Sequence, residues 1–174
     1  MSKTNKTRQL EAALWETSVQ QGHFGCFEVT IGWYGKEIVD FITYLSTGEF
    51  RCYEIKVSVA DFKSRAKLSF HGDYNYYVIP EKLLHELRKN TAREYSSEDL
   101  HLFDTQIKNS KIGLITVSES GMLTYLIRAK RKSVNMGMKA TLLESMVRSM
   151  NREVKKFYTL DPYWKLTEGE DLLC

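Results

Sequence analysis

Three residues of chemically useful types lie close together in the chain. Asp40 interrupts the apolar run IVDFITY of residues 38–44, and Glu54 and Lys56 flank Ile55 in the next apolar segment. A carboxylate in an apolar strand is costly unless something compensates its charge. Side chains alternate along a strand, so Glu54 and Lys56 share one face. Because the two segments are predicted to form a hairpin, we expect two carboxylates and one ammonium to converge on the sheet.

Such a trio suits a hard-metal site with an electrophilic partner. Mg²⁺, or Mn²⁺ in its place, prefers oxygen ligands, so Asp40, Glu54 and the backbone carbonyl of Ile55 are the predicted ligands. A metal there would lower the pKa of a bound water and screen a phosphodiester. Lys56 could position that water or stabilise charge developing on the phosphate oxygens. The pattern therefore indicates phosphodiester hydrolysis.

A structural interpretation competes with this one. A Glu-x-Lys pair on a strand is common and is usually a solvated salt bridge. A half-buried Asp beside a Lys can equally be a structural ion pair. The apolar surroundings of Asp40 are the feature that favours a functional site.

Several polar residues around the trio have two interpretations each. Glu28 alternates with apolar neighbours and faces either the site or solvent. Asp61 either caps the start of a helix or supports the site, and Ser58 is a turn residue or a supporting hydrogen-bond donor. Lys63 and Lys67, four residues apart on the same predicted helix, either contact phosphates or lie on a solvated face.

The elements that must position these residues follow from apolar periodicity and turn residues. Helices are predicted at 7–20, 60–70, 81–89 and 139–157, and strands at 27–31, 38–44, 50–57, 75–79, 112–117 and 122–127. Residues 90–110 are polar and are predicted to be an irregular loop. The order indicates an α/β fold, a mixed sheet flanked by helices. We expect one domain over 1–158, and a C-terminal tail at 159–174 that docks or frays.

Charge is distributed unevenly along the 174 residues. The chain has 25 Lys and Arg against 22 Asp and Glu, a net charge of +3. Residues 128–156 hold nine basic residues against two Glu, or +7, whereas residues 157–174 hold four acids against one Lys, or −3. A basic segment of this kind suits a polyanion. We expect Arg128, Lys130, Arg131 and Lys132 to contact phosphates without reading sequence, unless they only solubilise the surface.

Other compositional features exclude whole classes of protein. No apolar run is long enough to span a membrane, and the first residues do not resemble a secretory signal. The three cysteines are far apart and form no zinc motif. They are expected to be reduced thiols in a cytoplasmic protein.

The arrangement Val39-Asp40, thirteen residues, Glu54-Ile55-Lys56 resembles the PD-(D/E)XK nuclease superfamily. The strings EIKVSVADF (54–62), DYNYYVIP (73–80) and GLITV (113–117) are similar to those of MmcB-family DNA-repair proteins and related phage nuclease-like proteins. FEV (27–29) and RAKRK (128–132) also fit, so the resemblance covers roughly residues 8–156. Two positions depart from the pattern, since Val39 replaces a Pro and Arg65 stands where the family commonly carries an acid.

The resemblance implies a restriction-endonuclease-like fold with Asp40 and Glu54 as metal ligands and Lys56 as the catalytic lysine. It also implies that a Glu of the first helix approaches the metal, which makes Glu11 a candidate and Glu16 its substitute. A Glu on a helix is otherwise usually solvated.

The resulting hypothesis is a Mg²⁺-dependent DNA endonuclease of repair, restriction or phage type, in the cytoplasm of a prokaryotic or phage-infected cell. The first alternative is an inactive nuclease-fold protein that binds DNA or acts as a scaffold. RNA is a further possible substrate, because contact with a 2′-hydroxyl has no sequence signature. A homodimer is possible, and no membrane partner is expected.

Overall fold

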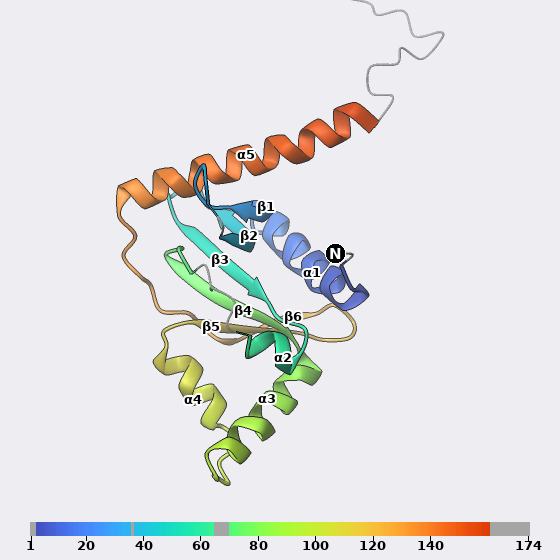
Figure 1. The fold of residues 1–174 in the computed structure, drawn as a ribbon, viewed down its shortest axis with the longest axis vertical. Helices are drawn as coiled ribbons and strands as arrows, with labels where there is room; N and C mark the ends of the chain where they lie inside the picture. Colours follow the sequence, from blue (N-terminus) through green and yellow to red (C-terminus); the bar gives the residue numbers. More distant parts are fainter. Residues whose placement is uncertain (1–2, 36, 65–69, 161–174) are drawn as a thin grey trace, which may run out of the picture.

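Six strands form one sheet, and their order across the sheet is their order along the chain. The computed structural model describes residues 3–35, 37–64 and 70–160. The strands are β1 (Phe24–Thr30), β2 (Ile38–Tyr44), β3 (Phe50–Ile55), β4 (Tyr74–Pro80), β5 (Gly113–Val117) and β6 (Leu123–Ile127). β3, β4 and β5 pair in parallel and the other neighbours are antiparallel. The fold is α/β with a mixed sheet, as predicted (Figure 1).

Helices cover both faces of this sheet. The helices are α1 (Asn5–Gln20), α2 (Val59–Phe62), α3 (Glu81–Glu94), α4 (Leu102–Asn109) and α5 (Met136–Leu160). α1 packs on one face, which we call the α1 face. On the opposite face, α3 and α4 cover β4 and β5, whereas α5 crosses β1 and β2 (Figure 1). The parallel strands therefore lie in the middle of the sheet, buried on both sides.

α1 forms because its sequence supplies both a cap and an apolar stripe. The Thr4 side chain accepts a hydrogen bond from the Thr7 backbone N–H, which satisfies one of the free donors at the start of the helix. Leu10, Ala13 and Leu14 recur at helical spacing and are buried on the sheet. The opposite side of the helix stays in solvent. α1 thus has a fixed rotation about its axis, which decides which polar side chains face the sheet.

A row of aromatic rings crosses the α1 face from one edge of the sheet to the other. Successive ring centroids are 4.3–6.3 Å apart, a spacing typical of favourable aromatic pairs. The members are, in order, Trp15 of α1 and then Phe27, Phe41, Tyr53, Tyr76 and Tyr125 of the sheet. Such cross-strand pairs fix the register of neighbouring strands. We call this set the aromatic row.

The prediction of an irregular loop at 90–110 was wrong. α3 continues to Glu94, and α4 occupies residues 102–109. Phe103 and Ile107 lie one helical turn apart and are buried against α3 and β5. The Arg88 guanidinium also forms an ion pair with Asp104, at 2.6 Å. The apolar residues of this helix, Leu102, Phe103 and Ile107, were too weak a periodic signal to predict it.

Two other boundaries differ from those predicted. The helix expected at 60–70 is the four-residue α2, and residues 65–69 lie outside the described part. α5 begins at Met136 and runs to Leu160, past the expected domain boundary at 158. The remainder of the expected tail, 161–174, also lies outside the described residues.

Asp73 connects α5 to the sheet. The residue is 1% exposed, and its carboxylate accepts a hydrogen bond of 2.9 Å from the Phe50 backbone N–H. The Lys139 ammonium of α5 lies 3.2 Å from the same oxygen. A buried charge is tolerated where it is paired and hydrogen-bonded in this way.

Asp73→Ala is expected to destabilise the fold by about 3 kcal/mol, because it leaves the Lys139 ammonium without its buried partner. Chemical denaturation followed by circular dichroism measures the change. Glu98→Ala, which removes an exposed acid, is the matched control. Equal stability of the two variants would show that this ion pair does not anchor α5.

Candidate functional site

The site begins where the ladder between β2 and β3 ends. The last paired residues are Phe41 and Tyr53, and the next residues on the two strands are Asp40 and Glu54. The Asp40 carboxylate accepts a hydrogen bond of 2.7 Å from the Ile55 backbone N–H. A side chain thereby takes over the acceptor role that a strand carbonyl would otherwise fill. The two strands separate beyond this bond.

The alternation of side chains breaks at the same level of the sheet. Phe27 and Phe41 pack on the α1 face, whereas Val29 and Val39 pack on the opposite face, under α5. Regular alternation would keep residues two apart on one face. Glu28, which lies between Phe27 and Val29 on β1, has a φ of +50°, a left-handed conformation that is uncommon for a non-glycine residue. This local distortion turns the strands, so that Asp40 lines a cleft beside α1.

That cleft is small and rich in carboxylates. Its volume is about 210 Å³. It is lined by four acids, Glu11, Glu28, Asp40 and Asp61, and by Lys3, Thr7, Ile55 and Val57. The acids come from α1, β1, β2 and α2. We call it the acidic cleft.

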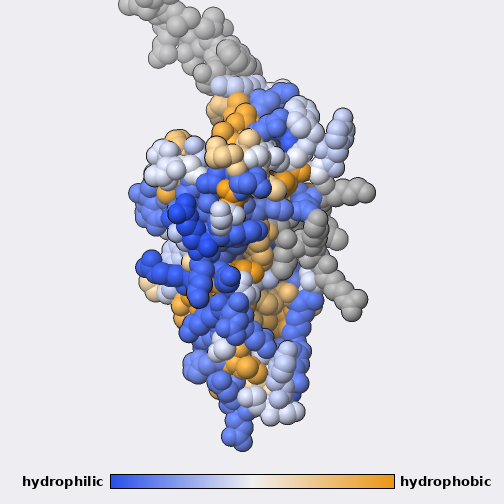
Figure 2. Space-filling model, turned by 90° about the vertical axis from the view of Figure 1, so that its left-hand side faces the viewer, coloured by the Kyte–Doolittle hydropathy of each residue, from blue (hydrophilic) through white to orange (hydrophobic). Residues whose placement is uncertain are grey.

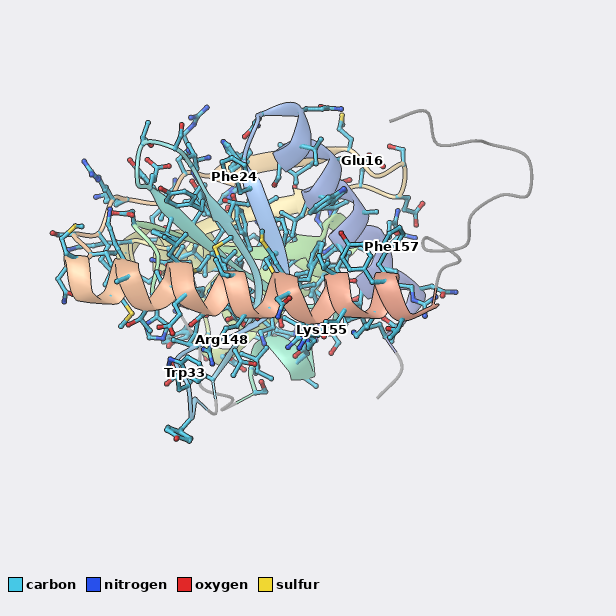
Figure 3. All side chains as sticks on the ribbon, turned by 90° about the horizontal axis from the view of Figure 1, so that it is seen from above. Glu16, Phe24, Trp33, Arg148, Lys155 and Phe157 are labelled. Atoms are coloured by element: carbon cyan, nitrogen blue, oxygen red, sulfur yellow. The ribbon has the colours of Figure 1, made fainter. Side chains whose placement is uncertain are left out.

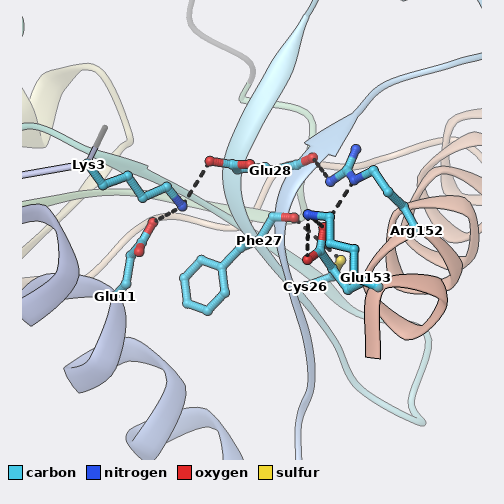
Figure 4. A network of polar contacts seen from close by, with 8 residues as sticks. Lys3, Glu11, Cys26, Phe27, Glu28, Arg152 and Glu153 are labelled. Atoms are coloured by element: carbon cyan, nitrogen blue, oxygen red, sulfur yellow. Dashed lines mark hydrogen bonds and ion pairs between the residues drawn. The ribbon is translucent and has the colours of Figure 1, made fainter. Parts of the chain in front are cut away.

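Lys3 provides a cation within the acidic cleft. Its ammonium lies 2.7 Å from a carboxylate oxygen of Glu11 and 2.8 Å from one of Glu28 (Figure 4). These ion pairs raise the pKa of Lys3, although desolvation acts against them. Lys3 precedes the helix and carries no recognisable signal in the sequence, so sequence reasoning missed it. The pairing shows that the cleft attracts positive charge.

Lys56 reaches the acidic cleft through Asp61. Its side chain is buried, and its ammonium lies 3.6 Å from one oxygen of Asp61. The other oxygen of Asp61 accepts a hydrogen bond from the Val57 backbone N–H, and the Ser58 hydroxyl accepts one from the Asp61 N–H. Ser58 and Asp61 thus cap α2. Asp61 also lines the cleft, so both of its predicted roles have a geometric basis.

Glu54 does not line this cleft. Tyr53 and Ile55 lie on the α1 face, whereas Glu54 follows the alternation of Cys52 toward the opposite face. It is 4% exposed and pairs in register with Tyr77 of β4. The pKa of the Tyr77 phenol is raised to about 12 by burial and by the charge of Glu54. The backbones of Asp40 and Glu54 are neighbours, but their side chains are not brought together in the cleft.

Burial dominates the electrostatics of Asp40. Desolvation raises the pKa of its carboxyl, and the charges of Asp61 and Glu11 act in the same direction. The hydrogen bond from Ile55 and the charge of Lys56 oppose this rise without cancelling it. Ionised Asp40 is therefore destabilised where it lies. A cation placed beside it would be bound favourably.

The carboxylate oxygens of the acidic cleft are the kind of ligand that a hard cation prefers, but they are not grouped as a metal site requires. Carboxylate oxygens are what Mg²⁺ prefers, and it commonly uses one or two of them together with water. Within 3–35, 37–64 and 70–160, however, no three His, Cys, Asp or Glu side chains are grouped to hold a metal ion. The ammonium groups of Lys3 and Lys56 lie against three of the four acids in the cleft. A metal would have to replace the Lys3 ammonium to reach Glu11 and Glu28.

The other candidates lie apart from the acidic cleft. Lys63 pairs with Glu94 of α3, and Lys67 lies outside the described residues. Glu16, labelled in Figure 3, is exposed on α1 and does not line the cleft, whereas Glu11 does.

The four basic residues of 128–132, which follow β6, differ in their surroundings. Lys130 and Arg131 are exposed, whereas the Lys132 ammonium donates to the Phe70 carbonyl at 3.1 Å. Arg128 lines a second cleft on the α1 face, far along the sheet. The side of the molecule seen in Figure 2 is mostly hydrophilic, with scattered apolar residues.

Comparisons with known proteins define the fold and little else. No protein-family model matches the chain, and no curated protein matches it. A similar solved structure is the SPO1766 protein of unknown function from Silicibacter pomeroyi. The TM-score is 0.66 at 15% identity, over 99% of this chain and 100% of that one. The likeness shows a shared overall fold. No helix in the described part of the chain has the length and apolar character to cross a membrane.

Asp40→Asn is expected to remove a pH-dependent loss of stability. Asn keeps an oxygen for the Ile55 N–H but cannot ionise. In the unmodified protein, stability should fall as pH rises from the unfolded pKa of about 3.9 through the raised pKa of folded Asp40. The free energy of unfolding of Asp40→Asn minus that of the unmodified protein should therefore increase across this window and stay constant above it. Urea denaturation at several pH values between 4 and 7 measures this difference, and a decrease would contradict the assigned burial.

Proposed function

We propose that this protein is a metal-dependent phosphodiesterase that acts on DNA, of the repair, restriction or phage type. The observation that supports the proposal best is the partly buried carboxylate of Asp40, held at the end of a strand ladder in a cleft with three other acids. Its charge is poorly compensated by the surrounding chain. Structural ion pairs usually compensate each other, so an undercompensated carboxylate in a cleft is a candidate functional group.

Each residue has a defined part in this proposal. Asp40, Glu11 and the Ile55 carbonyl would hold Mg²⁺ or Mn²⁺, and Glu54 would join them only by turning from the opposite side of β3. The metal would supply Lewis acidity toward a phosphodiester and a more acidic bound water. Lys56, held by Asp61, would stabilise charge that develops on the phosphate oxygens. Asp61 and Ser58 would fix the position of Lys56 by holding the turn after β3.

The fold is compatible with this assignment. The sequence strings around Asp40 and Glu54 resemble PD-(D/E)XK nucleases, and the mixed sheet has the helix, hairpin and parallel strands that this resemblance implies. A restriction-endonuclease-like fold thus remains part of the proposal. Action in the cytoplasm of a prokaryotic or phage-infected cell, and pairing of two copies, are likewise predictions.

A second candidate function is a nuclease-fold protein that binds DNA without cutting it. One specific observation favours it, namely that the ammonium groups of Lys3 and Lys56 form ion pairs with Glu11, Glu28 and Asp61 within the chain itself. A cleft that carries its own counterions can be stable without a metal. The two candidates therefore differ in whether a divalent cation displaces Lys3.

Lys56→Met is expected to lower metal-dependent cleavage by at least about 100-fold, the usual effect of removing a group that stabilises transition-state charge. Met preserves the length of the buried side chain. Nicking of supercoiled DNA and cutting of single-stranded and branched DNA, each with Mg²⁺ and with Mn²⁺, measure the rate. Lys108→Met, which removes an exposed lysine in the last turn of α4, is the matched control and should retain activity. Absence of cleavage by the unmodified protein on every substrate would favour the second candidate, and full activity of Lys56→Met would overturn the assignment of Lys56.

Lys3→Met tests the competition between the ammonium and a metal. Removal of the positive charge should let Mn²⁺ stabilise the protein at a lower concentration than in the unmodified chain, because the cation no longer displaces Lys3. Thermal denaturation over a Mn²⁺ titration measures the effect. Lys6→Met is the control, since Lys6 does not line the acidic cleft. If Mn²⁺ stabilises neither Lys3→Met nor the unmodified protein, the acidic cleft is not a metal site.

A further inference from the structure

A second cleft lies on the α1 face, at the end of α1 opposite the acidic cleft. Its volume is about 470 Å³. The lining comes from the start of β3, from β4, from β6 with the residues that follow it, and from the end of α1. The residues are Gln21, Arg51, Tyr74, Tyr76, Tyr125, Arg128 and Ala129. We call it the tyrosine cleft.

Two of the three tyrosines of this cleft, Tyr76 and Tyr125, are the last rings of the aromatic row. Tyr76 and Tyr125 meet edge to face with centroids 5.5 Å apart. Gly113 permits this position, because a Cβ at residue 113 would lie 2.3 Å from the Tyr76 ring. The row continues through Tyr53, which stacks on Tyr76. The rings are therefore held in place by the core, while Tyr125 remains only partly buried.

Of the two cations of the cleft, Arg51 is held in place by neighbouring side chains. The Arg51 guanidinium lies 5.7 Å from the centroid of the Tyr74 ring, and its Nε donates to Glu49 at 2.7 Å. Arg128 is exposed and makes no ion pair with any described residue. None of the described residues that line the cleft is acidic. Because Glu49 forms an ion pair with Arg51, the net positive charge of the tyrosine cleft comes from Arg128, whereas the acidic cleft is rich in carboxylates.

We propose that the tyrosine cleft binds single-stranded nucleic acid, with a base against its tyrosine rings and phosphates at Arg51 and Arg128. Aromatic rings beside cations are the combination that recognises unpaired strands, since every base has a face that can stack. In a duplex those faces are already stacked on neighbouring bases and cannot reach the rings. The cleft therefore favours a single strand over a duplex.

This inference deepens the proposed function. It rests on that function only where it treats the bound strand as the substrate that is cut. Arg51 and Ile55 lie on the same strand and the same face, four residues apart, or about 13 Å. Ile55 is the residue that holds Asp40. At about 3.4 Å per stacked nucleotide, this separation corresponds to about four nucleotides. A strand held in the tyrosine cleft could thus place a phosphate a few nucleotides away at the acidic cleft.

Fluorescence anisotropy with a labelled twenty-nucleotide dT strand, in EDTA, measures binding without cleavage. Tyr125→Ala is expected to weaken binding by about tenfold, within the range for loss of one stacked base. Tyr95→Ala, which removes an exposed tyrosine at the end of α3, is the matched control and should bind as the unmodified protein does.

Arg51→Gln and Arg128→Gln should each reduce the slope of log affinity against log salt by about 0.7. A duplex of the same length should bind more weakly, and a U strand separates RNA from DNA.

The outcomes separate the two proposals. If Tyr125→Ala binds the strand as tightly as Tyr95→Ala, or if the salt slopes do not change, the tyrosine cleft is not the binding site. Circular dichroism of each variant verifies that it is folded. Strand binding that depends on Tyr125, together with no metal-dependent cleavage, would support the cleft and overturn the nuclease proposal. Cleavage that depends on Lys56, together with normal strand binding by Tyr125→Ala, would support the nuclease proposal and overturn the tyrosine cleft as the binding site.

Discussion

The aromatic row is the constraint on which the rest of the structure depends. Its rings connect five elements of the sheet and α1 through contacts of 4.3–6.3 Å, so neither the register of the strands nor the position of α1 can change independently. α1 in turn brings Glu11 and Thr7 to one cleft and is followed by Gln21 at the other. Both candidate sites are therefore positioned by the packing of a single apolar layer.

The two clefts on the α1 face carry charges of opposite sign. The acidic cleft contains four carboxylates and the tyrosine cleft contains two guanidinium groups. A net charge of +3 conceals this separation. A cation is attracted to one end of the α1 face and a phosphate chain to the other, which is the distribution a protein needs if it brings a cation and a nucleic acid together.

The sequence allowed most of the fold to be predicted, because apolar segments such as that of 38–44 mark the strands that are buried. It failed at α4, where Phe103 and Ile107 are the only buried apolar residues of the helix. For the site, Asp40, Glu11 and Asp61 were predicted and do line one cleft. The convergence of Asp40 with Glu54 was inferred from the expected hairpin, which does make their backbones neighbours, but only Asp40 lines the cleft, beside the left-handed backbone at Glu28. A distortion of one residue, like the ion pairs of Lys3, leaves no pattern in the sequence.

The strand order also has a consequence for how the chain folds. Every ladder joins strands that are consecutive in the sequence, so each strand that emerges during synthesis can pair with the one made just before it. Such an order keeps the loops that must close short and favours rapid folding. α5 is the exception, because it follows β6 yet packs on β1 at the far edge. Its return across the whole sheet makes it the last element that can dock, so the earlier strands must remain associated without it until translation has passed residue 160.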